Sequence, residues 1–306
     1  MKPTIAVLGG GSIGLLLAGR LQAAGQSCVV WTKTRSQAER IRREGLGVDE
    51  GEGTPSQRLS IEAVPWEDAD TFEEGVVLLA VKQTSLTAEF LSRLAVVVPP
   101  SATLVALQNG VGHEALLRRA LPGRTIILAV TTEGALRIDD TTVRHTGRGD
   151  IRLGDDGKAN PESLRNVEGM LKAAGFSVFL SKELGIEVKR KLLINAVINP
   201  LTAILRIPNG GLTETPERME LARALFDETF SILSEYGVDE QEASWDTVMR
   251  VCAATRDNRS SMLQDAVMGK PTEIDSINGE IVRLAARLGR DAPWNRAVTA
   301  LVKAIH

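Results

Sequence analysis

Short apolar runs alternate with segments of helical spacing through the first half of the chain. The runs are rich in β-branched residues and are bounded by glycine, proline or polar clusters, which is typical of buried parallel strands. They comprise residues 5–8, 28–31, 76–81, 104–107 and 126–130. The segments of helical spacing between them are residues 13–24, 36–43, 85–97 and 115–120. This alternation predicts an α/β fold with a doubly wound, Rossmann-type sheet.

The pattern changes near residue 140. Residues 142–145, 150–153 and 177–180 are predicted to be further strands, and residues 161–174 a helix. Beyond about residue 182 only the apolar spacing of helices remains. These helices are predicted at residues 187–205, 215–236, 242–255, 260–268, 273–288 and 294–305, with Gly237 and Gly289 as helix stops. We therefore predict a Rossmann-type domain over residues 1–182 and an all-helical domain over residues 183–306.

Composition and charge narrow the class of protein. The chain has 306 residues, enough for two domains, and its 43% hydrophobic and 25% charged residues are typical of a soluble globular protein. A net charge of −3 gives no sign of a nucleic-acid or acidic-membrane partner. The apolar run at residues 192–205 is too short to span a bilayer, and the start of the chain lacks a signal-peptide pattern. Cys28 and Cys252 are interpreted as buried thiols of a reducing compartment, so we expect a cytoplasmic protein.

A glycine-rich turn follows the first predicted strand and opens the first predicted helix, which is the context that a dinucleotide-binding motif requires. Gly9 permits a tight turn, Gly11 lets a pyrophosphate approach the backbone, and Gly14 lets helix and strand pack closely. The free N–H groups of the helix start favour phosphate. A glycine loop without a ligand is the alternative. The predicted cofactor-binding turn comprises Gly9, Gly10, Gly11, Ser12, Ile13 and Gly14.

The end of the second strand bears on the choice between NAD and NADP. An NAD enzyme usually places an acidic residue there to hold the ribose 2′-hydroxyl. Here residues 31–35 contain no acid but include Lys33 and Arg35, which suit a 2′-phosphate. The sequence therefore favours NADP(H), with ordinary solvated charges as the alternative.

Two polar residues follow strands at the edge of the sheet where ligands bind. Lys82 comes directly after residues 76–81, and Asn109 follows residues 104–107. A surface lysine and a turn residue are the alternatives. We predict that both side chains lie beside the cofactor crevice.

The helix predicted at residues 187–205 carries polar residues spaced by four in an otherwise apolar run. Lys191, Asn195 and Asn199 would stack along one side of it. Burial of such groups without partners costs several kcal/mol, so the spacing indicates a polar crevice that a ligand completes. A solvent-facing stripe is the alternative. Pro200 removes one helical N–H group and is predicted to kink or end the helix.

Two later positions carry further candidate chemistry. Either Ser260 or Ser261 can cap the helix that follows, which leaves the other to bind a carboxylate at the positive helix end. Glu273 opens the next predicted helix, where an acid is also favourable for purely structural reasons.

The chain resembles the ketopantoate reductases (2-dehydropantoate 2-reductases) along its whole length. Besides the glycine turn, the resemblance lies in blocks whose order and spacing are typical of this family and not of dehydrogenases in general. These blocks are Val81-Lys82-Gln83, Gln108-Asn109-Gly110-Val111-Gly112, Lys191 with Leu192 through Asn195, Val197-Ile198-Asn199-Pro200-Leu201-Thr202-Ala203, Pro208-Asn209-Gly210, Ser260 through Asp265, and Glu273-Ile274-Asp275 with Ile277-Asn278-Gly279.

The resemblance implies NADPH-dependent reduction of 2-dehydropantoate to (R)-pantoate, in the pathway to pantothenate and coenzyme A. It implies that Lys191 is the catalytic lysine that gives a proton to the ketone oxygen. It also implies that Glu273 borders both the nicotinamide ribose and the substrate. The implied cofactor positions beyond the turn are Lys33, Arg35, Lys82, Asn109, Ala135 and Glu273, and the implied substrate positions are Lys82, Asn109, Lys191, Asn195, Asn199, Asn209 and Ser261.

The chemistry is coherent without a metal. Negative charge builds on the ketone oxygen as hydride arrives, and an ammonium group stabilises that charge and supplies the proton. The scattered His113, His145 and His306 form no metal cluster, and we assign them no role. We expect the site between the domains, with closure on cofactor binding. The apolar helix faces are compatible with a homodimer, although core packing explains them equally.

Two rival functions remain at this point. A paralogue with the same site chemistry would reduce another small 2-keto acid, and a panel of keto acids separates it from the first hypothesis. A non-catalytic NADP-binding sensor would bind the cofactor without turnover, and it leaves the pair Lys191 and Glu273 unexplained.

Overall fold

A computed structural model describes residues 4–51, 57–154 and 160–305. The chain forms two compact units. The first comprises Met1–Gln108 and His113–Leu184, and the second comprises Asn109–Gly112 and Gly185–His306. The division falls close to residue 182, where the strand signals end. A prediction based on a single boundary places Asn109 in the first domain, whereas the loop Asn109–Gly112 clusters with the helical unit.

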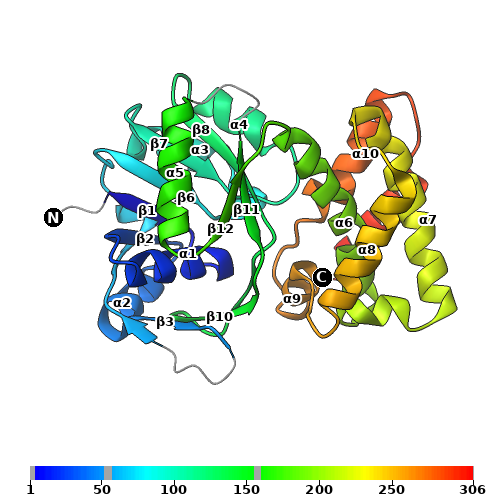
Figure 1. Ribbon diagram of the computed structural model, residues 1–306, viewed down its shortest axis with the longest axis horizontal. Coiled ribbons are helices and arrows are strands. Elements are labelled where there is room, and N and C mark those ends of the chain that lie inside the picture. The colour runs from blue at the N-terminus through cyan, green and yellow to red at the C-terminus, as the bar shows by residue number, and fades with distance from the viewer. Residues whose placement is uncertain (1–3, 52–56, 155–159, 306) are drawn as a thin grey trace. The chain divides into compact units, whose positions relative to one another are not determined.

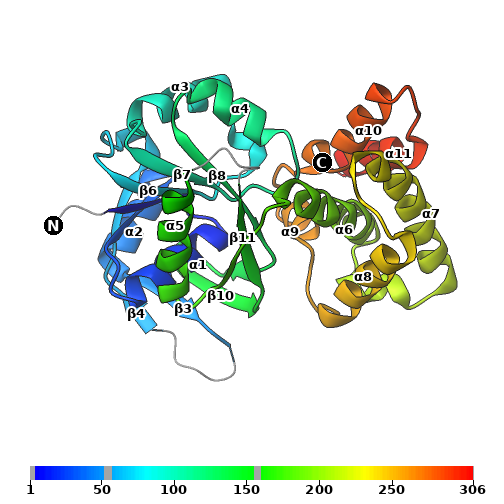
Figure 2. The ribbon, with the colours of Figure 1, turned by 45° about the horizontal axis from the view of Figure 1, so that its top comes forward.

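The first unit is built on an eight-stranded sheet (Figures 1 and 2). Its neighbouring strands are parallel except for the antiparallel pair β8 and β11. In spatial order the strands are β12 (Ser177–Leu180), β11 (Asp150–Gly154), β8 (Thr125–Thr131), β7 (Ala102–Ala106), β6 (Gly75–Leu79), β1 (Ile5–Leu8), β2 (Cys28–Thr32) and β5 (Glu62–Pro65). The Rossmann-type sheet is thereby confirmed. β5 escaped prediction because it is short, polar at its start and ends in proline, as edge strands often do.

A second sheet of four strands belongs to the same unit. Its spatial order is β4 (Gln57–Leu59), β3 (Leu46–Asp49), β10 (Thr142–Gly147) and β9 (Gly134–Arg137). Only β10 was predicted. The other three strands have at most four residues and contain glycine or charged residues, so they lack the apolar run that identified the central strands.

Helix α1 (Ser12–Ala23) contacts strands of both sheets. It is covered on two sides, which explains why most of its residues are apolar and buried. The helix predicted over residues 85–97 divides into a short 3₁₀ turn and α3, because Thr87 caps α3 by accepting from Phe90 N. The other helical elements of this unit are α2 (Arg35–Glu44), η1 (Trp66–Asp68), η2 (Gln83–Ser85), α3 (Ala88–Val97), α4 (His113–Ala120) and α5 (Pro161–Ala173).

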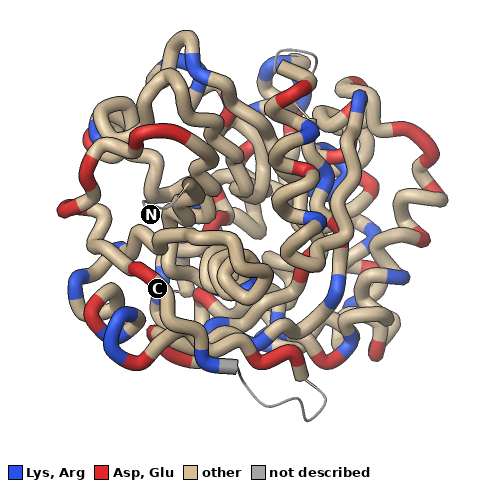
Figure 3. Tube along the Cα trace, turned by 60° about the vertical axis from the view of Figure 1, so that its left-hand side comes forward, with Lys and Arg blue, Asp and Glu red and all other residues tan. Residues whose placement is uncertain are grey.

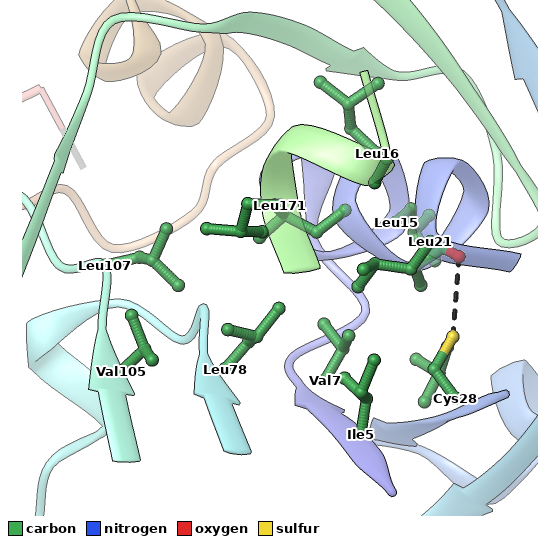
Figure 4. Packing of buried hydrophobic residues seen from close by; sticks show 14 of the residues in the cluster. Ile5, Val7, Leu15, Leu16, Leu21, Cys28, Leu78, Val105, Leu107 and Leu171 are labelled. Atoms are coloured by element: carbon green, nitrogen blue, oxygen red, sulfur yellow. Dashed lines mark hydrogen bonds between the residues drawn. The ribbon is translucent and has the colours of Figure 1, made fainter. Parts of the chain in front are cut away.

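The core of the first unit lies between α1, α5 and the large sheet. Figure 4 shows leucines of α1 above Ile5 and Val7 of β1, with Leu171 of α5 beside them. The Cys28 thiol donates to the carbonyl oxygen of Ala18 at 3.5 Å, also drawn there. Both cysteines are free and buried, as predicted.

The secondary-structure elements within the described residues of the second unit are all helices. Its elements are α6 (Leu184–Leu205), η3 (Asn209–Thr213), α7 (Pro216–Leu233), η4 (Ser234–Tyr236), α8 (Gln241–Ala254), α9 (Ser261–Val267), η5 (Ile274–Ser276), α10 (Asn278–Arg287) and α11 (Pro293–Lys303). Gly237 and Gly289 have φ values of 91° and 66°, so the predicted helix stops are confirmed. Among the described residues, no helix is both long and apolar enough to cross a bilayer.

One prediction about this unit was wrong. The helix predicted from residue 273 is interrupted at Ile277, whose ψ of −90° lies outside the helical range, and α10 begins at the next residue. Pro200 was predicted to kink or end its helix, and it does not end it, because α6 continues to Leu205. The proline leaves the carbonyl of Ala196 without its helical donor, and Asn278 Nδ2 donates to that oxygen at 2.8 Å. A side chain of α10 therefore replaces the missing N–H group.

Charged residues of both signs are interspersed along the chain, and Figure 3 shows blue and red segments intermixed. This distribution agrees with the small net charge of −3.

Candidate functional site

A side chain would have a different effect at each of three glycines in the first turn. Gly9 has φ of +126°, and a Cβ atom on it would lie 2.9 Å from the carbonyl group of Ala80. A Cβ atom on Gly14 would overlap the carbonyl oxygen of Gly9. A Cβ atom on Gly11, by contrast, would meet no atom within 4 Å. Gly9 and Gly14 need to be glycine because a side chain would clash there. Gly11 leaves open space beside the backbone.

The start of α1 is suited to an anion. Gly11 is its N-cap residue and has no side chain with which to cap the N–H groups of the first turn. Ser12 Oγ accepts from the backbone N–H of Arg137 at 3.0 Å, so its own proton remains available for donation. Open space, uncapped N–H groups and the positive helix end together fit the diphosphate of a dinucleotide.

The predicted 2′-phosphate residues lie on the surface after β2. Lys33 is exposed. Arg35 begins α2, and its guanidinium contacts the carboxylates of Asp68 at 2.7 Å and Glu67 at 3.4 Å, both from η1. Arg35 therefore already has anionic neighbours, a feature that the sequence did not reveal.

The first unit contains two more predicted cofactor positions, Lys82 and Ala135, and one residue that was not predicted, Gln108. Lys82 is partly buried and lies three residues beyond β6, directly before η2. Ala135 lies on β9, pairs with His145 of β10 and packs against the unit's core. Gln108 is part of one motif of the family resemblance but was not predicted to have a role of its own. Its Nε2 donates to the carbonyl oxygens of Leu79 and Val81, which joins the ends of β6 and β7.

In the second unit, the structure brings Lys191 and Asn109 together although 82 residues separate them. Lys191 Nζ donates to Asn109 Oδ1 at 2.6 Å. Burial lowers the pKa of Lys191 to about 8, and the negative charge of Glu273 opposes this effect. Glu273 is 8% exposed and precedes η5. A partly buried ammonium, an amide and a carboxylate therefore form one group.

The other predicted substrate positions of α6 are sheltered. Asn195 is partly buried and Asn199 is buried, so the alternative of a solvent-facing stripe is wrong. Both lie on the same side of α6 as Lys191, because the three are spaced by four. This side of α6 therefore presents an ammonium group and two amides in a sheltered setting.

The structure separates the roles of the two serines. Ser260 caps α9 by accepting from Leu263 N at 3.1 Å, and it is buried against Thr202. Ser261 is the exposed first residue of α9. Asn209 lies in η3 and donates to Thr255 Oγ1 at 2.8 Å, while its buried Oδ1 has no hydrogen-bond partner among the described residues.

No group of His, Cys, Asp and Glu side chains suited to a metal ion occurs within residues 4–51, 57–154 and 160–305. His145 instead lies between Glu133 and Glu50, with its two ring nitrogens 2.6 and 3.2 Å from their carboxylates. Burial lowers the pKa of His113 to about 4, and its Nδ1 lies 3.1 Å from Gln83 Nε2. His306 lies outside the described residues.

The Rossmann-type unit with an open turn at the start of α1, and the helical unit with a sheltered lysine, are compatible with the class of nicotinamide-dependent oxidoreductases. Family models narrow this class. The model described as ketopantoate reductase PanE/ApbA matches residues 5–158, and the model of its C-terminal part matches residues 187–306. The chain belongs to the ketopantoate reductase family.

Individual relatives agree with this family assignment. The 2-dehydropantoate 2-reductase of Bacillus subtilis (strain 168) is 33% identical over 303 residues, which is 98% of this chain and 97% of that protein. The crystal structure of a probable 2-dehydropantoate 2-reductase from Bacillus subtilis has a TM-score of 0.81 at 32% identity and covers 99% of both chains. D-mandelate dehydrogenase with NADH and anilino(oxo)acetate has a TM-score of 0.90 at 21% identity, covering 98% of this chain and 97% of that chain, a likeness of fold.

Proposed function

We propose that the protein reduces 2-dehydropantoate to (R)-pantoate with NADPH, as a cytoplasmic step toward pantothenate and coenzyme A. The observation that carries the proposal is the group formed by Lys191, Asn109 and Glu273. It holds a lysine whose pKa of about 8 lies close to neutral pH, where proton donors work best. Membership of the ketopantoate reductase family supports the choice of substrate.

Lys191 performs the acid step in this proposal. Its ammonium group donates a proton to the ketone oxygen as negative charge develops there, and it stabilises that charge in a sheltered setting. Asn109 accepts from Lys191 Nζ and fixes its position. The carboxylate of Glu273 keeps the ammonium form favoured against the effect of burial.

Polar side chains of the second unit orient the keto acid. Asn195 and Asn199 offer amide groups on the same side of α6 as Lys191. Ser261 offers a hydroxyl at the start of α9, and Asn209 of η3 is a further candidate through its side-chain amide. These groups can hold the carboxylate and hydroxyl of 2-dehydropantoate while leaving its ketone to Lys191.

The first unit holds the cofactor. Residues 9–14 would receive the diphosphate. Lys33 and Arg35 would bind the 2′-phosphate. Lys82 and Ala135 of the same unit are further candidate contacts of the cofactor. When bound, the reduced nicotinamide supplies the hydride, so the protein contributes position and the proton.

A steady-state assay of nicotinamide absorbance tests the proposal. The purified protein should oxidise NADPH when 2-dehydropantoate is added. In a panel of 2-keto acids, 2-dehydropantoate should give the highest kcat/KM. A higher value for another keto acid identifies a paralogous reductase, and NADPH binding without turnover of any keto acid identifies a non-catalytic sensor.

Cofactor choice gives a separate prediction. Asp68→Asn frees Arg35 from its 2.7 Å partner, so the variant should bind NADPH about three- to fivefold more tightly, with the Kd for NADH nearly unchanged. Asp70→Asn removes the same charge from an exposed residue nearby and serves as the control. Equal tightening toward both cofactors would show that Arg35 does not recognise the 2′-phosphate.

A further inference from the structure

The carbonyl oxygen of Gly10 accepts two hydrogen bonds from side chains outside the phosphate turn. Gln37 Nε2 donates at 2.8 Å from α2, and Arg137 Nη1 donates at 3.0 Å from β9. The backbone N–H of Arg137 also donates to Ser12 Oγ at 3.0 Å. These bonds hold Gly10 and Ser12 from the side of the turn that faces α2 and β9.

Gln37 is buried and doubly anchored. Its side chain is 3% exposed, and its Nε2 also donates to the carbonyl oxygen of Asp140 at 3.1 Å. A Cβ atom on residue 10 would lie 2.5 Å from Gln37 Oε1. Gly10 is absent from the glycines with positive φ. A side chain at this position would therefore have to displace the end of the Gln37 side chain, whereas no unusual backbone angle requires glycine there.

The direction of the Gly10 carbonyl fixes the direction of the next N–H group. The peptide is trans, so its C=O and N–H groups point opposite ways. With the carbonyl directed at Gln37 and Arg137, the N–H of Gly11 points away from both. Gly11 is exposed with open space beside it, so this part of the turn is accessible to a ligand. A rotated peptide would present its oxygen there and repel a phosphate.

We propose that Gln37 and Arg137 are positioning residues that keep the phosphate turn presenting N–H groups, and not a carbonyl oxygen, to the diphosphate of the cofactor. The inference rests on the proposed function, because it requires that this turn binds a dinucleotide. Neither side chain has to touch the ligand. Arg137 Nη2 lies 3.4 Å from Asp140 Oδ1, which partly neutralises its charge, so its role is to hold Gly10 more than to attract phosphate.

Gln37→Met tests the proposal, because it removes the donor while leaving side-chain length and net charge nearly unchanged. By calorimetric titration, the Kd values for NADPH and 2′-phospho-ADP-ribose should rise about tenfold. The Kd for adenosine 2′-phosphate, which lacks the diphosphate, should stay within about twofold. General loss of structure would weaken all three ligands alike, whereas a misdirected turn weakens only the first two.

Two further variants complete the experiment. Gln26→Met is the matched control, because Gln26 Nε2 donates to the carbonyl oxygen of Met170 at 2.9 Å, away from the turn, and no affinity should change. Gly10→Ala displaces Gln37 and should reproduce the selective loss. Unchanged affinities, or equal losses for all three ligands, in Gln37→Met and Gly10→Ala would overturn the proposal. NADPH binding by the unaltered protein reports separately on the proposed function.

Discussion

Replacement of Lys191 by alanine should lower kcat for the reduction of 2-dehydropantoate by about 10²–10⁴-fold, the usual contribution of a positioned proton donor. The Kd for NADPH should stay within about twofold, because the phosphate turn lies in the other unit. Lys189→Ala is a matched control. It removes a lysine from the same helix whose Nζ donates to the carbonyl oxygen of Tyr236, and it should retain most of the activity.

The pH dependence identifies the mechanism behind that loss. A proton donor must be protonated, and the pKa of Lys191 is about 8. In the unaltered protein, kcat/KM for reduction should therefore fall about tenfold per pH unit above this pKa. The residual activity of Lys191→Ala should lack this fall. If the variant keeps both its activity and the alkaline fall, another group donates the proton.

Replacement of Asn278 by alanine should lower the free energy of unfolding of the second unit by about 2–4 kcal/mol. Asn278 is fully buried, and its Nδ2 donates to the carbonyl oxygen of Ala196 and to Asn295 Oδ1. The variant leaves the Ala196 oxygen buried without a donor, because Pro200 has no N–H group to offer. Thermal unfolding should shift downward by roughly 5–12 °C.

A double-mutant cycle isolates the contribution of that hydrogen bond. Pro200→Ala restores the helical N–H group, so the Ala196 oxygen regains a donor without Asn278. Asn278→Ala should then destabilise by about 1 kcal/mol less in the Pro200→Ala background than in the unaltered protein. An equal loss of unfolding free energy in both backgrounds would show that the hydrogen bond to Ala196 does not contribute to stability.

The central sheet was predictable because its strands are buried on both faces and therefore read as continuous apolar runs. Ile5–Leu8 is an example, and the structure reproduces that strand without change. The strands β3, β4 and β9 were missed because tertiary pairing, and not local pattern, makes them strands. The passage of α6 through Pro200 depends on Asn278, which lies 78 residues further along and whose contribution no local rule contains.

Part of the candidate site followed from spacing and part did not. The glycine spacing predicted the tight turn between β1 and α1, because a tight turn and a helix start impose it locally. The contact between Lys191 and Asn109 joins two predicted residues whose proximity only the fold establishes. No sequence pattern pointed to Gln37 or Arg137, because glutamine in a helix and arginine in a short strand are usually surface residues. Only the fold shows that both side chains donate to the Gly10 carbonyl oxygen.

Transfer of deuterium tests the central claim most directly. The protein is incubated with 2-dehydropantoate and NADPH deuterated at both C4 positions of the nicotinamide, and the product is examined by mass spectrometry. The account predicts pantoate that is one mass unit heavier and carries deuterium at C2. Absence of pantoate, or pantoate without deuterium at C2, would contradict it.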